Sequence, residues 1–156
     1  FLFVGPRPAA DLILGFISFY FLMLAFGVNP WLSIVGALAF GLCSYNFQII
    51  QVGHNAKMTA IALMPAVLAA LVYAFRKNRW LGAVLFGITL SFEIMANHPQ
   101  ITFYLAFITI FYGIAQLCKL VVLWTTLLID LKYLPTYQFS LLLKFSILCK
   151  SFIIYS

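Results

Sequence analysis

The sequence predicts an all-α protein, a polytopic transmembrane bundle of helices that cross a lipid bilayer. Hydrophobic residues make up 65% of the 156-residue chain and charged residues only 8%, whereas ordinary soluble domains have about 45–50% and about 25%. A water-soluble fold of this size needs more polar side chains to cover its surface. The apolar residues also form long runs without the alternation that is typical of a membrane β-barrel. The lipid bilayer is therefore the expected partner of the chain.

Five apolar runs in residues 1–117 match a membrane-spanning helix, which needs roughly 20 apolar residues to cross about 30 Å of hydrocarbon. Backbone groups in lipid must form hydrogen bonds within their own segment, so runs of this length predict helices. The predicted spans cover residues 11–28, 31–52, 58–75, 80–96 and 101–117.

Short polar segments separate these runs and predict where each helix ends. Asn29-Pro30 stops the first run, because the residue before a proline disfavours the helical conformation. The second run turns polar toward its end, at Asn46, Gln48 and Gln51. The remaining breaks are residues 53–57, 76–79 and 97–100.

The basic residues predict the orientation of the bundle, because short cytoplasmic loops carry an excess of Lys and Arg. Three of them stand in residues 76–79, so this loop is predicted to be cytoplasmic, and Lys119 falls on the same side. The segments around Asp11, His54 and His98 then share the outer face. The net charge of +6 does not indicate a nucleic acid partner, because the basic residues do not cover a soluble face.

Small residues recur at every fourth position in three of the runs and predict where helices pack closely. These stripes indicate a bundle without identifying an activity. They are formed by Ser33, Ala37 and Gly41, by Ala62, Ala66, Ala70 and Ala74, and by Ala83, Gly87 and Ser91.

The composition of the chain changes near residue 117. The last 41 residues contain neither Gly nor Ala, and Lys144 and Lys150 interrupt an apolar stretch where charge is costly in lipid. We interpret residues 1–117 as a transmembrane helical bundle, a fragment of a larger membrane domain. Residues 118–156 are interpreted as an atypical apolar tail that is out of frame or otherwise non-native. The alternative is that the tail forms further spans.

Polar residues near the outer ends of the spans form the candidate substrate-binding site, because ionisable groups in a membrane are costly and by default mark function. Glu93 and Asn97 are four residues apart and share a helix face, and Thr89 lies one turn deeper. Lys provides a charge for a phosphate, His donates a hydrogen bond or carries a proton, and amides fix orientation. An anionic ligand is therefore expected at His54, Asn55, Lys57, Glu93, Asn97, His98 and Gln100.

Structural interpretations of the same residues stay open. Glu93 and Lys57 would also serve as a buried ion pair, and His54 and His98 as interfacial residues satisfied by lipid headgroups or backbone carbonyls. A metal site of His54, His98 and Glu93 has suitable ligand types, but these residues lack close ligand spacing. No metal or cofactor is therefore predicted, and the residues alone identify an outward-facing polar cavity without a catalytic group.

Three stretches together resemble the bacterial YfhO family of multi-spanning membrane proteins, over roughly residues 9–116: GVNPWLSIVGALAF at residues 27–40, GHNAK at residues 53–57 and EIMANHPQIT at residues 93–102. That family is similar to the GT-C superfamily of glycosyltransferases. The resemblance implies a protein of the bacterial cytoplasmic membrane that takes a sugar from a polyprenyl-phosphate carrier. The sugar would pass to an envelope polymer on the outer side of the membrane.

The resemblance also implies roles for individual residues. Lys57 and His54 would contact the phosphate of the lipid-linked sugar donor, and Glu93, Asn97 and His98 would shape the cavity. GT-C enzymes usually carry a catalytic acidic residue in the first outer loop, and this chain is expected to begin beyond that loop. Asp11 is therefore not assigned as the catalytic base, the catalytic residue stays unknown, and the fragment alone is expected to be inactive.

Two other functions remain open at this point. A membrane transporter or flippase with an outward-facing polar cavity is the alternative, since intramembrane charges also line substrate paths. A bundle that serves assembly without catalysis is the third. Transporters often have repeated halves and broken helices at the midplane, whereas this sequence shows no internal repeat and places its polar residues near one face. That pattern favours an enzyme.

Overall fold

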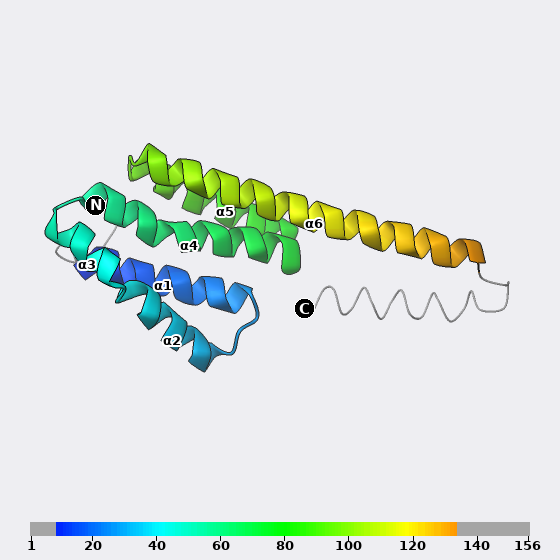
Figure 1. Ribbon diagram of the computed structural model, residues 1–156, viewed down its shortest axis with the longest axis horizontal. Coiled ribbons are helices and arrows are strands. Elements are labelled where there is room, and N and C mark those ends of the chain that lie inside the picture. The colour runs from blue at the N-terminus through cyan, green and yellow to red at the C-terminus, as the bar shows by residue number, and fades with distance from the viewer. Residues whose placement is uncertain (1–8, 134–156) are drawn as a thin grey trace. The chain divides into compact units, whose positions relative to one another are not determined.

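The computed structural model describes residues 9–133, of which residues 9–128 are described with their side chains. The described residues are helical apart from short connections, and they contain no strand (Figure 1). The helices are α1 (Ala9–Ala25), α2 (Pro30–Gly41), α3 (Ser44–Gln51), α4 (Asn55–Arg76), α5 (Arg79–Met95) and α6 (Pro99–Tyr133).

The chain divides into two compact units, residues 1–107 and residues 108–156. The first unit contains α1 to α5 and the beginning of α6, and the second contains the rest of α6. All packing and all site geometry described below belong to the first unit.

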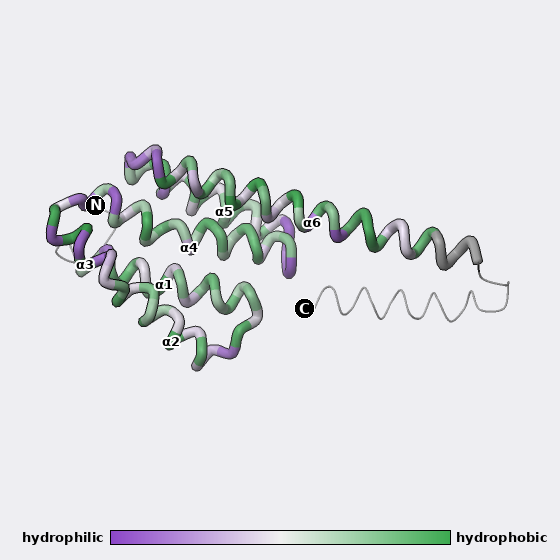
Figure 2. Tube along the Cα trace, viewed as in Figure 1, coloured by the Kyte–Doolittle hydropathy of each residue, from purple (hydrophilic) through white to green (hydrophobic). Residues whose placement is uncertain are grey.

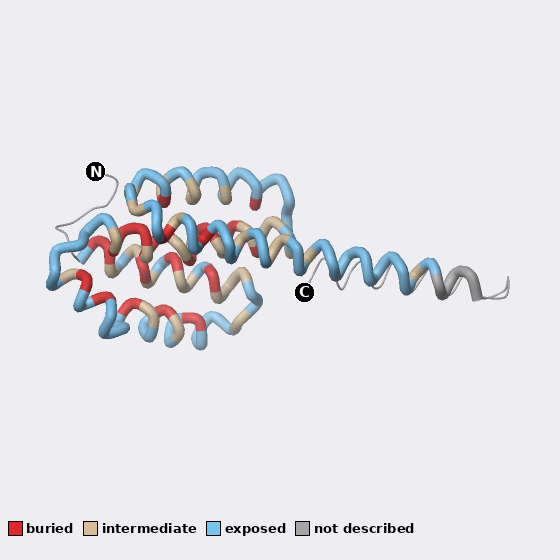
Figure 3. Tube along the Cα trace, turned by 45° about the horizontal axis from the view of Figure 1, so that its top comes forward, coloured by how far each residue is buried: buried red, intermediate tan, exposed pale blue. Residues whose placement is uncertain are grey.

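Helix α4 is the central helix of the first unit. Both α1 and α5 pack along it, α2 packs against α1, and α3 contacts α4. Buried residues gather between the packed helices, while the outer faces are exposed (Figure 3). The core of α4 consists of small and medium apolar side chains, with Ala60, Ala62 and Val67 fully buried. Small side chains at the centre let the neighbouring backbones approach closely.

The outer faces of the helices are strongly apolar (Figure 2). Trp80, for example, is 87% exposed, and a continuous apolar exterior of this kind marks a membrane or partner interface. Within the described residues, three helical segments are long and apolar enough to cross a membrane: Pro30–Gln51, Asn55–Arg76 and Pro99–Leu128. The all-helical, membrane-type architecture predicted from the sequence is therefore confirmed, whereas the count of five spans is not.

The predicted helix over residues 31–52 is broken, which corrects the expectation of one continuous span. Helix α2 ends at Gly41 and α3 begins at Ser44. The side chain of Asn46 is buried, and its Nδ2 donates hydrogen bonds to the carbonyls of Phe40 (2.9 Å) and Gly41 (3.3 Å). Carbonyls freed inside a membrane need a donor from the protein, and Asn46 supplies it.

The predicted boundaries at residues 29–30 and 76–79 are confirmed as helix ends. Asn29 caps α2, because its side chain accepts a hydrogen bond from the Trp31 amide (3.0 Å), and Asn78 caps α5 in the same way. Such caps satisfy amide groups that have no partner within the helix. Arg76 donates a hydrogen bond to the Phe26 carbonyl (2.7 Å), which joins the end of α4 to the loop after α1.

The predicted burial of the small-residue stripes is confirmed on α2, partly confirmed on α4 and wrong on α5. On α2, Ser33, Ala37 and Gly41 are buried, as predicted, and a Cβ at Gly41 would clash with the Phe16 ring. On α4, Ala62 and Ala70 are buried, whereas Ala66 and Ala74 are half-buried.

On α5 the prediction is wrong. Ala83, Gly87 and Ser91 are all exposed, and nothing in the described structure lies within 4 Å of a Cβ placed at Gly87. The close contact of α5 is instead made by Gly82, where a Cβ would clash with the backbone of Ala74.

Helix α6 continues without a break past residue 117, the predicted end of the fifth span, as far as Tyr133. Lys144, Lys150 and the rest of the tail from residue 134 lie outside the described residues, as does Arg7, the basic residue that precedes Asp11 in the sequence. The interpretation of residues 118–156 as non-native stays a prediction.

Candidate functional site

One end of the first unit collects most of its polar side chains. Helices α1 and α4 begin at this end, α5 ends there and α6 begins there (Figure 1), and hydrophilic residues colour the same end (Figure 2). We call this the polar end. It contains the seven residues predicted from the sequence, His54, Asn55, Lys57, Glu93, Asn97, His98 and Gln100, together with Asp11, Thr59 and Thr102.

The start of α4 carries three of the predicted residues. Gly53 has a positive φ of 79°, a conformation that glycine adopts without strain, and it lets the chain turn from α3 into α4. His54 and Asn55 are exposed at this turn, and Lys57 is half-buried. The Lys57 Nζ lies 5.4 Å from the centroid of the Tyr45 ring, within the range of a cation–π contact. Tyr45 on α3 thus positions the ammonium group.

Glu93 is fully buried at the last turns of α5. Its Oε1 accepts a hydrogen bond from the hydroxyl of Thr102 on α6 (3.1 Å), and its Oε2 has no hydrogen-bond partner. Removing a carboxyl group from water without satisfying it is costly. The Glu93 Oε2 atom is therefore a buried polar group that no described residue satisfies.

The turn between α5 and α6 carries the other predicted residues. Asn97 adopts a positive φ of 56°, which asparagine tolerates better than most residues. His98 is half-buried, and its Nδ1 is buried without a hydrogen-bond partner. Gln100 donates a hydrogen bond to the Tyr104 hydroxyl (3.2 Å).

A groove of about 390 Å³ opens at this turn, and its walls include Asn97, His98 and Thr102. The groove sets the polar groups beside the apolar side chains of Ile94 and Phe103. Apolar walls with a few placed polar groups are typical of small-molecule sites.

Asp11 is the acidic residue at the polar end that was not assigned to the site from the sequence. It is only 3% exposed in the first turn of α1. Its Oδ1 accepts a hydrogen bond from the Thr59 hydroxyl on α4 (2.9 Å), and its Oδ2 is buried without a partner. The only signal in the sequence was an acidic residue at the start of an apolar run.

The structure does not bring Glu93 and Lys57 into an ion pair. Glu93 contacts Thr102 and Lys57 contacts Tyr45. Thr89 does not extend the polar end inward, because its hydroxyl donates to the carbonyl of Leu85 in its own helix (2.8 Å). Across the described residues, no group of three or more His, Cys, Asp or Glu side chains is placed to hold a metal ion.

The arrangement offers two kinds of contact at one end of the bundle. Asp11 and Glu93 are buried carboxyl groups with one free oxygen each, and such oxygens accept hydrogen bonds from hydroxyl groups. His54 and Lys57 are accessible from outside, and they suit an anion. A ligand with both hydroxyl and phosphate groups would match this pattern.

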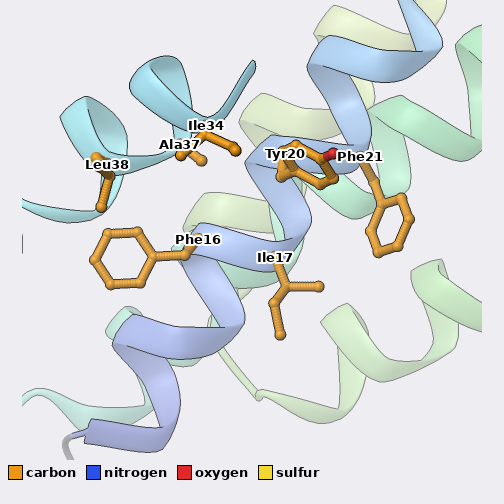
Figure 4. A pocket seen from close by; sticks show the side chains of 7 residues that line it. All are labelled: Phe16, Ile17, Tyr20, Phe21, Ile34, Ala37 and Leu38. Carbon is orange, nitrogen blue, oxygen red and sulfur yellow. The ribbon is translucent and has the colours of Figure 1, made fainter. Parts of the chain in front are cut away.

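A second hollow lies between α1 and α2 (Figure 4). It has a volume of about 380 Å³, and Tyr20 is the only lining residue with a polar side-chain atom. The Phe16 ring projects from α1 on the side of Leu38 of α2, whereas the Phe21 ring points away from α2. An apolar hollow of this kind offers water few hydrogen-bond partners.

Comparison with family models, curated proteins and solved structures found no match to the chain.

Proposed function

We propose that this chain is part of an integral membrane glycosyltransferase of the GT-C type. The full protein would take a sugar from a polyprenyl-phosphate carrier and pass it to an envelope polymer on the outer face of the bacterial cytoplasmic membrane. The observation that carries the proposal is the polar end, where two buried carboxyl groups with free oxygens accompany an accessible Lys and two His. The resemblance of residues 9–116 to the YfhO family supports it.

The proposal assigns separate tasks to the two sides of the polar end. Lys57 and His54, at the start of α4, bind the phosphate of the donor. Glu93 and His98 form hydrogen bonds with the sugar hydroxyls, either as acceptors or as donors. Asn97 fixes the orientation of the sugar. The orientation predicted by the basic residues at 76–79 places this end outside the cytoplasm, which agrees with transfer to an envelope acceptor.

The full protein is proposed to cross the membrane with all five predicted segments. Helices α1 and α5 have 17 residues each, at the lower limit of roughly 17–25 residues for a span. Residues next to each helix would complete the crossing of a thin or locally compressed bilayer.

A membrane transporter or flippase is the second candidate, favoured by the break between α2 and α3. Broken helices in transporters expose backbone groups that coordinate substrate or ions. Here the carbonyls of Phe40 and Gly41 are already bonded to Asn46, so they are not free for a substrate. The break is therefore weak support for a transporter. The carboxyl oxygens without a partner are stronger support for an enzyme.

The experiment that tests the proposal follows a labelled polyprenyl-phosphate sugar in vesicles that contain the parent protein. Transfer of label to a polymer acceptor supports the enzyme, and movement of the intact lipid across the vesicle supports the transporter. Lys57→Ala is expected to reduce transfer at least tenfold, and Arg79→Ala, at the opposite end of the first unit, serves as the control for loss of a positive charge. Transfer that is unchanged by Lys57→Ala would overturn the phosphate role.

A further inference from the structure

A third cavity lies at the end of the first unit opposite the polar end. It has a volume of about 500 Å³ and is bounded by α1, α4 and α5. The cavity exists because α4 presents three small residues to it, Ala66, Ala69 and Ala70, opposite larger side chains such as Phe21 and Leu85.

The walls of this cavity are mainly apolar, and besides Lys77 their only polar side chains are Tyr73 and Thr89. Thr89 lines it, but the Thr89 hydroxyl is bonded to its own helix, so it offers no donor to the interior. Water would find few hydrogen-bond partners in such a space, and it needs two to four of them to be held. A hydrocarbon chain is the occupant that the walls favour.

The mouth of the cavity carries positive charge. Lys77 is exposed and lines the cavity, and Arg79 is an exposed neighbour two residues further on. Arg76 is already bonded to the Phe26 carbonyl. The acidic side chains described in the first unit, Asp11 and Glu93, both lie at the polar end, so no carboxylate described in that unit neutralises this mouth.

We propose that this cavity is a binding site for an anionic phospholipid, with an acyl chain between α1, α4 and α5 and the headgroup phosphate at Lys77. Basic pockets between membrane helices on the cytoplasmic side are a known recognition mode for anionic headgroups, and the positive-inside rule predicts this end to be cytoplasmic. The lipid is chosen by charge complementarity at the mouth and by the apolar walls behind it. The site is separate from the polar end and does not depend on the function proposed there.

The test offers phosphatidylglycerol and phosphatidylcholine with identical acyl chains, in equal amounts, to the full 156-residue chain in detergent. Native mass spectrometry counts the retained molecules of each lipid. We expect phosphatidylglycerol to be retained about fivefold over phosphatidylcholine, and Lys77→Gln to remove that preference, since one basic residue near the headgroup contributes about a fivefold effect. Lys119→Gln is the matched control and should leave the preference unchanged.

A second pair of variants tests the hydrocarbon part of the site. Ala66→Leu fills the cavity without changing charge, and it should lower retention of both lipids at least threefold. Ala83→Leu, on the exposed face of α5, adds the same side chain outside the cavity and should have no effect. If Ala66→Leu does not fold, Thr89→Phe fills the same space from α5.

The proposal would be overturned by equal retention of the two lipids by the unmodified chain, by a preference that survives Lys77→Gln, or by undiminished retention when the cavity is filled. Displacement of phosphatidylglycerol by glycerol phosphate would also overturn it, because the site would then bind a simple phosphate. Lys57→Gln, at the polar end, should change none of these measurements.

Discussion

The hydroxyl of Thr59 donates a hydrogen bond to the Asp11 carboxylate at 2.9 Å. This bond joins the beginning of α4 to the beginning of α1, although the two residues are 48 positions apart in the chain. The Thr102 hydroxyl does the same for Glu93 at 3.1 Å, between α5 and α6. In each pair a threonine satisfies one oxygen of a buried carboxyl group and leaves the other without a partner. The same arrangement thus fixes two acidic side chains at one end of the bundle and leaves one oxygen of each buried without a partner.

Loss of the Thr59 hydroxyl should destabilise the fold. Thr59→Val keeps the shape of the side chain but leaves both oxygens of Asp11 buried without a donor. The expected loss is about 1 kcal/mol, in the range of hydrogen bonds measured in membrane proteins, which average about 0.6 and reach about 1.7. Unfolding in detergent with increasing denaturant measures it.

Thr59→Ser is the matched control, because it retains the hydroxyl. In the Asp11→Leu background, where no carboxyl group needs a donor, the effect of Thr59→Val should largely disappear. Equal stability of the Val and Ser variants would show that the hydrogen bond contributes nothing.

Replacement of Glu93 should separate binding from stability. Glu93→Gln keeps an oxygen that accepts from Thr102 and removes the group that would ionise inside the protein, so the free energy of unfolding should fall by less than about 1 kcal/mol, the typical net value of one such bond. If Oε2 contacts a sugar hydroxyl, binding of the polyprenyl-phosphate sugar should weaken roughly tenfold, which corresponds to about 1.4 kcal/mol. Equilibrium binding of the labelled lipid checks this.

Thr102→Val is the control for Glu93→Gln, because it is expected to lower the stability of the fold more than the binding of the lipid-linked sugar. It removes a contact between α5 and α6, so it should affect stability more than Glu93→Gln does. A Glu93→Gln variant that unfolds readily and binds normally would contradict the assignment of the free oxygen to a ligand.

The helix boundaries could be predicted where the signal is local. Asn29-Pro30 and Asn78 mark helix starts, because their side chains cap the residues that immediately follow. The break at Leu42 and Cys43 carried no such signal, since neither residue opposes a helix strongly. Its stability depends on Asn46, which replaces the lost hydrogen bonds from α3, and an asparagine in an apolar run does not reveal which carbonyls it satisfies.

The candidate site shows the same division between local and long-range information. Glu93 and Asn97 were identified because they interrupt an apolar run four residues apart. Asp11 was noticed and not assigned, because its partner Thr59 belongs to another helix and the spacing of 48 residues has no periodicity to follow. The prediction for the small-residue stripe on α5 was wrong for a related reason. The four-residue spacing shows that these residues share one face of the helix, but it does not show whether another helix covers that face.

Gly82 should be the position on α5 that is least tolerant of a larger side chain. Gly82→Ala places a Cβ against the Ala74 backbone, and overpacking of this kind costs about 1–3 kcal/mol. Gly87→Ala is the matched control, with no described atom within 4 Å of the new Cβ, and it should stabilise the helix by up to about 1 kcal/mol. Thermal unfolding in detergent should rank the two variants on opposite sides of the unmodified chain. The same sign for both would mean that α4 and α5 do not approach at Gly82.

Asn46 should be necessary for the break between α2 and α3. Asn46→Leu leaves the Gly41 carbonyl without a side-chain donor and the Phe40 carbonyl with the long bond from the Cys43 amide (3.4 Å), and a buried unsatisfied group costs about 1–3 kcal/mol. Gln48→Leu is the control, because Gln48 is an exposed amide on the same short helix. Hydrogen exchange of the Ser44 amide reports the change directly, because the Leu42 and Cys43 amides already donate to the Leu38 and Phe40 carbonyls when the helix is broken. If the carbonyls are satisfied by rejoining α2 and α3 into one helix, the Ser44 amide becomes protected while the stability loss is small. If the break persists, this amide stays unprotected and the full loss appears. Unchanged stability together with unchanged exchange would show that Asn46 does not hold the break in place.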